Sequence, residues 1–146
     1  MSKKLRGDLS IFIVDFKTSK KLKEFGFSET CTSFWEILID APESRNKTLL
    51  YTNQIEKDWN NDKWSIYSAP TRAETLEWFR RVHNYYIYII PRFDGFDGSQ
   101  YFCNYSIFRE GDKESSDING DGSYLYEEAE REAINEVLKF IEKGKP

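Results

Sequence analysis

Residues that carry catalytic chemistry are scarce in this 146-residue chain, which holds 1 histidine, 2 cysteines and 1 methionine. Because His83 is the only histidine, every Ser–His, Cys–His or multi-histidine metal arrangement would have to include it. Cys31 and Cys103 lie far apart in the chain, without the spacing of a zinc or redox motif, and we expect both to be reduced thiols. These shortages argue against most of the common catalytic arrangements.

The short motifs of catalytic and nucleotide-binding sites are absent as well. The chain has no G-x-G-x-x-G, no P-loop, no G-x-S-x-G and no H-E-x-x-H. His83 falls in the last turn of an expected helix, where a histidine can cap unpaired carbonyl groups and is stabilised as a cation by the helix dipole. We interpret it as a structural residue rather than a general base. The sequence therefore predicts a protein that is not an enzyme, with no catalytic residues and no cofactor.

Long apolar runs are also missing, and none approaches the roughly 18 residues that a membrane-spanning helix needs. The N-terminal sequence MSKKLRGDLSIFIVDF does resemble a signal peptide. However, Asp8 and Asp15 bracket its apolar run, and no small-residue cleavage site follows. We therefore expect residues 1–8 to form a disordered tail and the protein to be cytoplasmic, without a membrane partner.

The chain is mildly acidic and rich in aromatic residues. The chain carries 25 acidic and 21 basic residues, a net charge of −4, whereas a general nucleic-acid binder normally shows a basic surface. Aromatic residues are plentiful, with 11 Phe, 9 Tyr and 4 Trp. A chain of this length can bury about two thirds of its surface, which suffices for a core without metal or disulfide support. The length favours one domain, which we place at residues 9–142.

The stretch from Ser68 to Pro91 organises the predicted fold. Thr71 and Glu74 have the spacing of a capping box, so a helix should begin there. One arc of that helix would bring together Leu76, Trp78, Phe79, Val82 and His83. A strand follows over Tyr85–Ile90, apolar or aromatic on both faces, which predicts a central position in the sheet and an end at Pro91.

Shorter patterns predict the other elements. Strands are expected over residues 9–16, 31–39, 48–52 and 101–108, and helices over residues 18–25 and about 126–141. Thr18 or Ser19 would cap the first of these helices, and Gly144 would end the last. Residues 53–63 fit no element, and we expect Trp59 to fold back on the core rather than to lie exposed as a recognition residue.

The element order β-α-β-β-α-β-β-α predicts an α+β fold. We expect an antiparallel sheet of four or five strands, with two to three helices packed mainly on one face. The strand at 48–52 should pair antiparallel with the strand at 31–39, and the strand at 101–108 should form a hairpin with Tyr85–Ile90. The predicted core comprises Leu76, Phe79, Val82, Ile87, Ile89, Ile134 and Val137.

An acidic segment matches the twelve-residue calcium loop of an EF-hand, D-x-[DN]-x-[DN]-G-x5-E. The oxygen ligands would come from Asp117, Asn119, Asp121, Ser123 and Glu128. The segment before it has the pattern of a strand rather than a helix, and the chain has no second loop of this kind. Two interpretations stay open: an isolated calcium-binding loop of weak affinity, and an acidic turn that carries two Asx–Gly steps.

Tyrosines concentrate on the two strands of the expected hairpin, at Tyr85, Tyr86, Tyr88, Tyr101 and Tyr105. A sheet face that carries tyrosines can stack on bases. Phosphate contacts could come from Arg72, Arg80, Arg81, Arg92 and Arg109. The alternative is that these rings pack beneath helices, which the negative charge and the lack of an RNP pattern favour. Nucleic acid is therefore an unlikely partner and our third hypothesis.

Three blocks of the sequence carry a resemblance: LKEFGF with Cys31, then SAPT followed by WFR and His83, then YEEA with Ala133-Ile134. This pattern resembles a group of small uncharacterised proteins encoded by phages and mobile elements of gut anaerobic bacteria. The resemblance covers about residues 22–141 and implies a phage or mobile-element setting without a known activity. We therefore expect a non-enzymatic binding or interaction domain whose partner is another protein, with calcium binding as the alternative.

Overall fold

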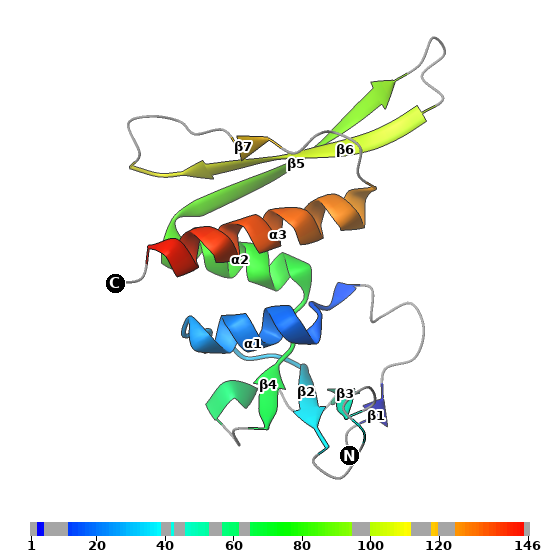
Figure 1. The fold of residues 1–146 in the computed structure, drawn as a ribbon, viewed down its shortest axis with the longest axis vertical. Helices are drawn as coiled ribbons and strands as arrows, with labels where there is room; N and C mark the ends of the chain where they lie inside the picture. Colours follow the sequence, from blue (N-terminus) through cyan, green and yellow to red (C-terminus); the bar gives the residue numbers. More distant parts are fainter. Residues whose placement is uncertain are drawn as a thin grey trace. The chain divides into compact units, whose positions relative to one another are not determined.

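The computed structural model describes residues 3–4, 12–38, 42, 46–52, 57–61, 65–94, 100–111, 118–119 and 125–144. The chain divides into two compact units, Met1–Thr71 (unit 1) and Arg72–Pro146 (unit 2). Each unit combines helical segments with an antiparallel sheet, which confirms the α+β class (Figure 1). The expectation of one sheet is wrong, because the described strands form a four-stranded and a three-stranded sheet. The single domain that we expect over residues 9–142 stays a prediction, but the expected disordered tail at residues 1–8 is wrong at Lys3–Lys4, which pair antiparallel with Tyr51 and Leu50.

Unit 1 is built on an antiparallel sheet in the strand order β1-β3-β2-β4. These strands are β1 (Lys3–Lys4), β2 (Ser33–Ile37), β3 (Lys47–Tyr51) and β4 (Ile66–Ser68). The register of β2 and β3 runs from Ser33 opposite Tyr51 to Ile37 opposite Lys47, so the predicted antiparallel pair is confirmed. Helix α1 (Phe16–Glu24) packs against β4. The sequence did not predict β4, because three residues are too few to show an alternating pattern.

The start of unit 1 differs from the predicted strand at residues 9–16. Ile13 makes one isolated bridge to Thr71, residues 14 and 15 have no regular structure, and α1 begins at Phe16. Asp15 caps this helix, since its Oδ1 atom accepts a hydrogen bond from the Thr18 amide at 2.8 Å. The predicted caps Thr18 and Ser19 are therefore wrong, because a carboxylate three residues earlier binds the exposed amide. Residues 9–11 lie outside the described part of the chain.

Trp59 is part of the core of unit 1, as predicted. It begins the short helical turn η3 (Trp59–Asn61), and only 7% of the residue is exposed. Its ring lies 4.2 Å from the ring of Phe34, and its Nε1–H group donates to the Cys31 carbonyl at 2.7 Å. The neighbouring Asn60 side chain donates to the Phe27 carbonyl at 2.8 Å, and its Oδ1 atom accepts a hydrogen bond from the Ser68 amide of β4 at 2.9 Å, which holds the turn against the sheet. A segment without periodicity is thus fixed by side-chain hydrogen bonds.

Unit 2 pairs a long hairpin with two helices. Its sheet has the order β5-β6-β7, with β5 (Tyr85–Asp94), β6 (Gln100–Arg109) and β7 (Ile118–Asn119). The antiparallel register of β5 and β6 runs from Tyr85 opposite Arg109 to Asp94 opposite Gln100, which confirms the predicted hairpin. Helix α3 (Tyr126–Lys143) lies along this hairpin and packs on both strands, and helix α2 (Arg72–His83) packs on α3 and β5 (Figure 1).

The core of unit 2 lies between α3 and β6. One face of α3 is buried, and it comprises Ala129, Ala133, Ile134, Val137, Leu138 and Ile141. Alternate residues of β6 are buried as well, namely Cys103, Tyr105 and Ile107. Gly144 ends α3, as predicted, and its amide bonds the Phe140 carbonyl at 3.0 Å. Among the described residues, no helix is both long enough and apolar enough to cross a membrane.

Strand β5 departs from its predicted place and length. It is the edge strand of the described sheet rather than a central strand, and it continues through Pro91 to Asp94. Proline lacks an amide hydrogen, so a strand with neighbours on both sides excludes it and an edge strand tolerates it. The predicted end at Pro91 is therefore wrong for the same reason as the predicted central position.

The buried arc of α2 is rotated from the predicted one. Trp78 and Phe79 are buried as expected, but Arg72 and Thr75 are buried too, and Val82 is 50% exposed. Ile87 and Ile89 are half-buried, so the predicted core is only partly correct. Apolar periodicity placed the arc on the Val82 side because it assigns an arginine to solvent. Arg72 is buried because it has an acidic partner in α3, described below.

Candidate functional site

The outer edge of β5 directs backbone groups away from its only described partner strand, β6. The amide of Glu110 donates to the Asn84 carbonyl at 3.1 Å, which extends the hairpin register by one pair. In an antiparallel ladder, bonded pairs alternate with pairs whose backbone groups point outward. The backbone of Tyr86, Tyr88 and Ile90 therefore points to β6, whereas that of Tyr85, Ile87 and Ile89 points to the outer edge.

Pro91 follows the same alternation. It lies opposite Cys103 in the register and shares the outward direction of Ile89. Its missing amide hydrogen therefore falls on the outer edge and leaves the ladder with β6 intact. This explains how β5 passes through a proline without a break.

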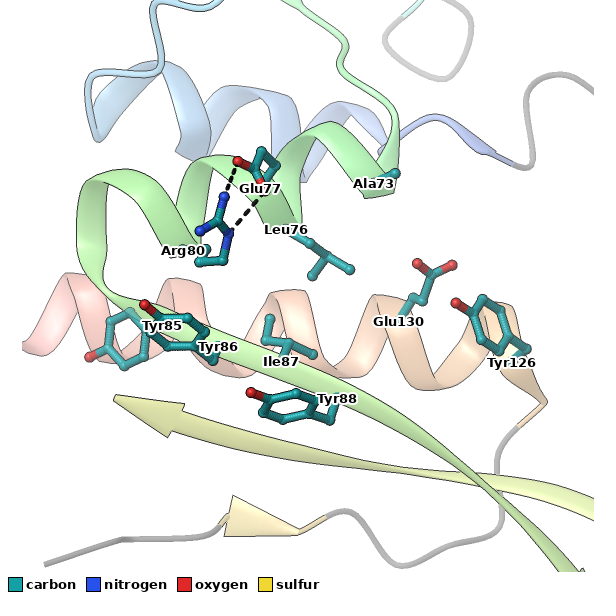
Figure 2. Close-up of a pocket in the computed structure, with 10 residues that line it drawn as sticks. All are labelled: Ala73, Leu76, Glu77, Arg80, Tyr85, Tyr86, Ile87, Tyr88, Tyr126 and Glu130. Carbon is teal, nitrogen blue, oxygen red and sulfur yellow. Dashed lines mark hydrogen bonds and ion pairs between the residues drawn. The ribbon is translucent and has the colours of Figure 1, made fainter. Parts of the chain in front are cut away.

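A pocket of about 410 Å³ lies along this edge (Figure 2). Four consecutive residues of β5, Tyr85 to Tyr88, line it. Successive side chains of a strand point to opposite faces, so four neighbours can line one pocket only when the strand turns its edge towards it. The pocket is therefore a groove that runs beside the outward-pointing backbone of β5.

Helix α2 forms the wall that faces β5. Its lining residues are spaced by three or four positions on one helical face: Ala73, Leu76, Glu77 and Arg80. Figure 2 shows the Leu76 side chain directed from α2 towards Ile87 on β5. Both residues are half-buried, so they give the groove an apolar floor.

The N-terminal turn of α3 closes one end of the groove with Tyr126 and Glu130. The Nε–H group of Arg72 donates to Oε1 of Glu130 at 3.2 Å, and this pair fixes the start of α2 to α3. Partial burial, and then the nearby Glu130 carboxylate, raise the pKa of the Tyr126 phenol. Tyr126 therefore stays neutral at physiological pH and can donate or accept a hydrogen bond.

An ion pair and a tyrosine hydroxyl mark the other end. Arg80 makes a two-pronged ion pair with Glu77, with Nε to Oε2 at 3.0 Å, and this bond lowers the pKa of the Glu77 carboxyl. The Tyr86 hydroxyl donates to Glu110 at 3.1 Å, and this bond raises the pKa of Tyr86. The charged groups at the groove are thus largely neutralised by one another.

The face of the hairpin opposite α3 carries exposed apolar side chains. Tyr88 is 56% exposed, Ile90 47% and Phe108 38%. The Tyr86 ring lies 6.3 Å from the ring of its cross-strand partner Phe108. We call these four residues the outer aromatic strip. It is continuous with the groove, because Tyr86 and Tyr88 belong to both.

The five predicted tyrosines do not share one face. Tyr85 and Tyr105 are buried, and Tyr85 stacks on Phe140 of α3 at 6.0 Å. Tyr86 and Tyr88 lie on the outer aromatic strip, and the side chain of Tyr101 lies outside the described part. The arginines are similarly dispersed, since Arg72 is buried in an ion pair and Arg80 is paired with Glu77. Arg81 and Arg109 are exposed, and the side chain of Arg92 is not described.

His83 lies in the last turn of α2, as predicted, and does not line the groove. Its ring packs edge-on against the Trp78 ring, with the centroids 4.6 Å apart. This contact supports the structural role that the sequence favours.

Most of the predicted calcium ligands cannot be placed. Asp117, Asp121 and Ser123 lie outside the described residues, and Asn119 pairs in β7 with Ser106 while its side chain is not described. Glu128 accepts a hydrogen bond from the Leu125 amide at 3.1 Å and so caps α3. Within the described ranges, no group of three or more His, Cys, Asp or Glu residues could hold a metal ion. The calcium site stays a prediction.

The groove itself was not predicted. Two signals in the sequence point to it in retrospect: the i, i+3, i+4, i+7 set on α2, and the uncharged first half of β5. The comparisons with known proteins add no further indication, because no family model, no curated protein and no solved structure matches the chain. The resemblance to phage and mobile-element proteins therefore stays a prediction, and function is inferred from this chain's own residues.

Proposed function

We propose that this chain is a non-enzymatic binding domain that binds another protein through the first half of β5. One observation carries the proposal: the outer aromatic strip exposes Tyr88, Ile90 and Phe108 beside a groove with an apolar floor. Large apolar side chains that gather on a surface typically mark an interaction site. Tyrosine is enriched among the residues that dominate binding energy, because its ring buries much area at little entropic cost.

The residues around the groove support binding rather than catalysis. Glu77 and Glu130, the carboxylates that line it, are each engaged by an arginine. The remaining polar groups there are tyrosine hydroxyls, and the lining includes neither histidine nor cysteine. Such groups orient a ligand, whereas acid–base catalysis needs a group whose pKa lies near the working pH.

The charge of unit 2 defines the partner further. Arg72–Pro146 carries 15 acidic and 10 basic residues. Complementary charge steers association and disfavours partners of like charge. The partner should therefore present an apolar surface within neutral or basic surroundings.

Site-specific cross-linking tests this proposal. A photo-reactive phenylalanine analogue at position 88 should cross-link one protein in cells that express the chain naturally. The same analogue at position 139, on the exposed side of α3, serves as the matched control. Phe108→Asp should abolish the cross-link from position 88 without a change in folding, because Phe108 is exposed. Equal products from positions 88 and 139, or a product that survives Phe108→Asp, would overturn the proposal.

A further inference from the structure

We infer that the groove takes an extended segment of the partner protein as an additional strand on β5. The inference rests on the proposed function and deepens it, because it states which chemistry of the partner is recognised. The backbone of the segment would pair with Tyr85, Ile87 and Ile89, and alternate side chains would enter the groove.

The outward-pointing backbone groups of β5 select an extended occupant. Their spacing repeats every second residue, which matches the backbone of another strand and of no other regular structure. Addition of a strand to an exposed edge is a recurrent mode of peptide recognition, in which main-chain hydrogen bonds give affinity and pockets give specificity. The β5 edge offers both, because the groove lies directly beside it.

The sequence of β5 sets the length of the segment. Folded proteins usually protect edge strands with charges, prolines or a short length. The six residues Tyr85–Ile90 contain neither charge nor proline, and protection begins only with Pro91 and Arg92. Pro91 offers no outward amide, so the added strand should pair with six residues and end there.

The walls of the groove set the composition of the segment. Side chains on one face of the added strand would meet the Leu76–Ile87 floor, and those on the other face would lie beside Tyr88 of the outer aromatic strip. Both positions favour apolar side chains. Because the charges at the groove are paired with one another, a charged side chain would be buried without compensation. The predicted segment is therefore apolar on both faces and uncharged over its paired length.

A second copy of this chain fits the groove less well. Its β5 would arrive with its own α2 alongside the edge, where the α2 of the first copy already forms the wall. A single extended segment brings no helix of its own to the edge. Pairing between the β5 edges of two copies would therefore contradict the inference. Analytical ultracentrifugation would detect such pairing as a dimer, and Ile89→Pro would dissociate that dimer.

A displayed library of random twelve-residue peptides, panned on the full chain, supplies the probe. Selected peptides should share a run of uncharged, apolar residues. Methylation of the peptide amides one at a time should lower affinity by about tenfold or more at every second position, since each such amide would lose a hydrogen bond within the ladder. Uniform losses, or losses without a two-residue period, would overturn strand addition.

The protein offers a matched pair of variants at one position. Ile89→Pro removes one outward amide in the same way as the natural Pro91, whereas Ile89→Ala removes side-chain atoms and keeps the amide. We expect the proline variant to lose about tenfold or more in peptide affinity and the alanine variant to stay within about threefold. If Ile89→Pro fails to fold, the methylation series alone decides the matter. Equal affinity of the two folded variants would contradict the inference.

The two proposals fail in distinguishable ways. If no peptide is selected while position 88 still cross-links a partner, the proposed function holds and strand addition is wrong. If selected peptides show the two-residue period but do not compete with the cross-linked protein, the groove binds strands and the assignment of that protein as its partner is wrong.

Discussion

Arg72 at the start of α2 and Glu130 in α3 form a buried ion pair, with Nε and Oε1 3.2 Å apart and side chains 4% and 10% exposed. The pair joins two helices that are separated by the whole hairpin in the sequence. It also closes one end of the groove, because Glu130 lines the pocket.

Removal of one partner of this pair should lower the stability of the fold. Arg72→Met leaves the Glu130 carboxylate buried without its partner, and we expect a loss of about 3–5 kcal/mol in the free energy of unfolding. The double variant Arg72→Met/Glu130→Leu should recover most of that loss, since no buried charge remains. Urea denaturation measures both. The exposed Lys139–Glu136 pair is the control, and Lys139→Met should cost less than about 1 kcal/mol.

Because the buried arc of α2 is rotated from the predicted one, truncation of two apolar residues to alanine should lower stability by unequal amounts. Phe79→Ala should lose about 3–5 kcal/mol of stability, because the side chain is fully buried and its removal leaves a cavity. Val82→Ala should lose about 0.5 kcal/mol or less, because Val82 is 50% exposed. Chemical denaturation of the two variants decides. Comparable losses in the two variants would show that Val82 belongs to the core, as the sequence pattern predicts.

Amide hydrogen exchange should alternate along β5. The amides of Tyr86, Tyr88 and Ile90 point to β6 and should be protected in the unliganded protein. Those of Tyr85, Ile87 and Ile89 point outward and should exchange at least about tenfold faster. Exchange measured by NMR gives each rate separately. Uniform protection over these six residues would show that another strand already covers the edge.

The hydroxyl of Tyr86 should titrate above its ordinary range. Its hydrogen bond to Glu110 raises the pKa of the phenol above 10.0. A raised pKa stabilises the folded state below the ordinary value, and that stabilisation is lost as pH rises through the folded value. Glu110→Gln should therefore shift the titration of Tyr86 downward. Ultraviolet difference spectra, with Tyr86→Phe to identify the signal, provide the measurement.

The calcium hypothesis makes a prediction that capping alone does not. A site at residues 117–128 should raise the melting temperature at millimolar calcium, and the rise should vanish in Asp121→Ala. Glu128 already caps α3, so Glu128→Ala should lose about 1 kcal/mol of stability even without calcium. If calcium does not change the melting temperature of the unmodified protein, the segment is an acidic turn rather than a calcium site.

Local periodicity predicted the elements of unit 2 better than their assembly. The hairpin and α3 follow from patterns within a few residues, and both are present. The division into two sheets, the edge position of β5 and the burial of Arg72 depend on partners far along the chain, which periodicity does not encode. Trp59 was placed correctly because a lone tryptophan is usually buried, although its hydrogen bond to Cys31 was not foreseeable.

The groove could not be predicted because three separate elements assemble it. The α2 face, the β5 edge and the first turn of α3 each look ordinary in the sequence, and only the hairpin register and the Arg72–Glu130 pair bring them together. The uncharged first half of β5 is visible in the sequence, but its pattern predicts a central strand. The same lack of charge suits an edge that another chain covers.

The position of Pro91 constrains how the length of β5 can change in evolution. An insertion of one residue between Tyr85 and Pro91 would turn the proline towards β6 and exchange the two faces of the strand. An insertion of two residues would preserve both the ladder and the faces. Length variation in this strand should therefore occur in steps of two residues, because only even steps keep the backbone nitrogen of Pro91 on the outer edge.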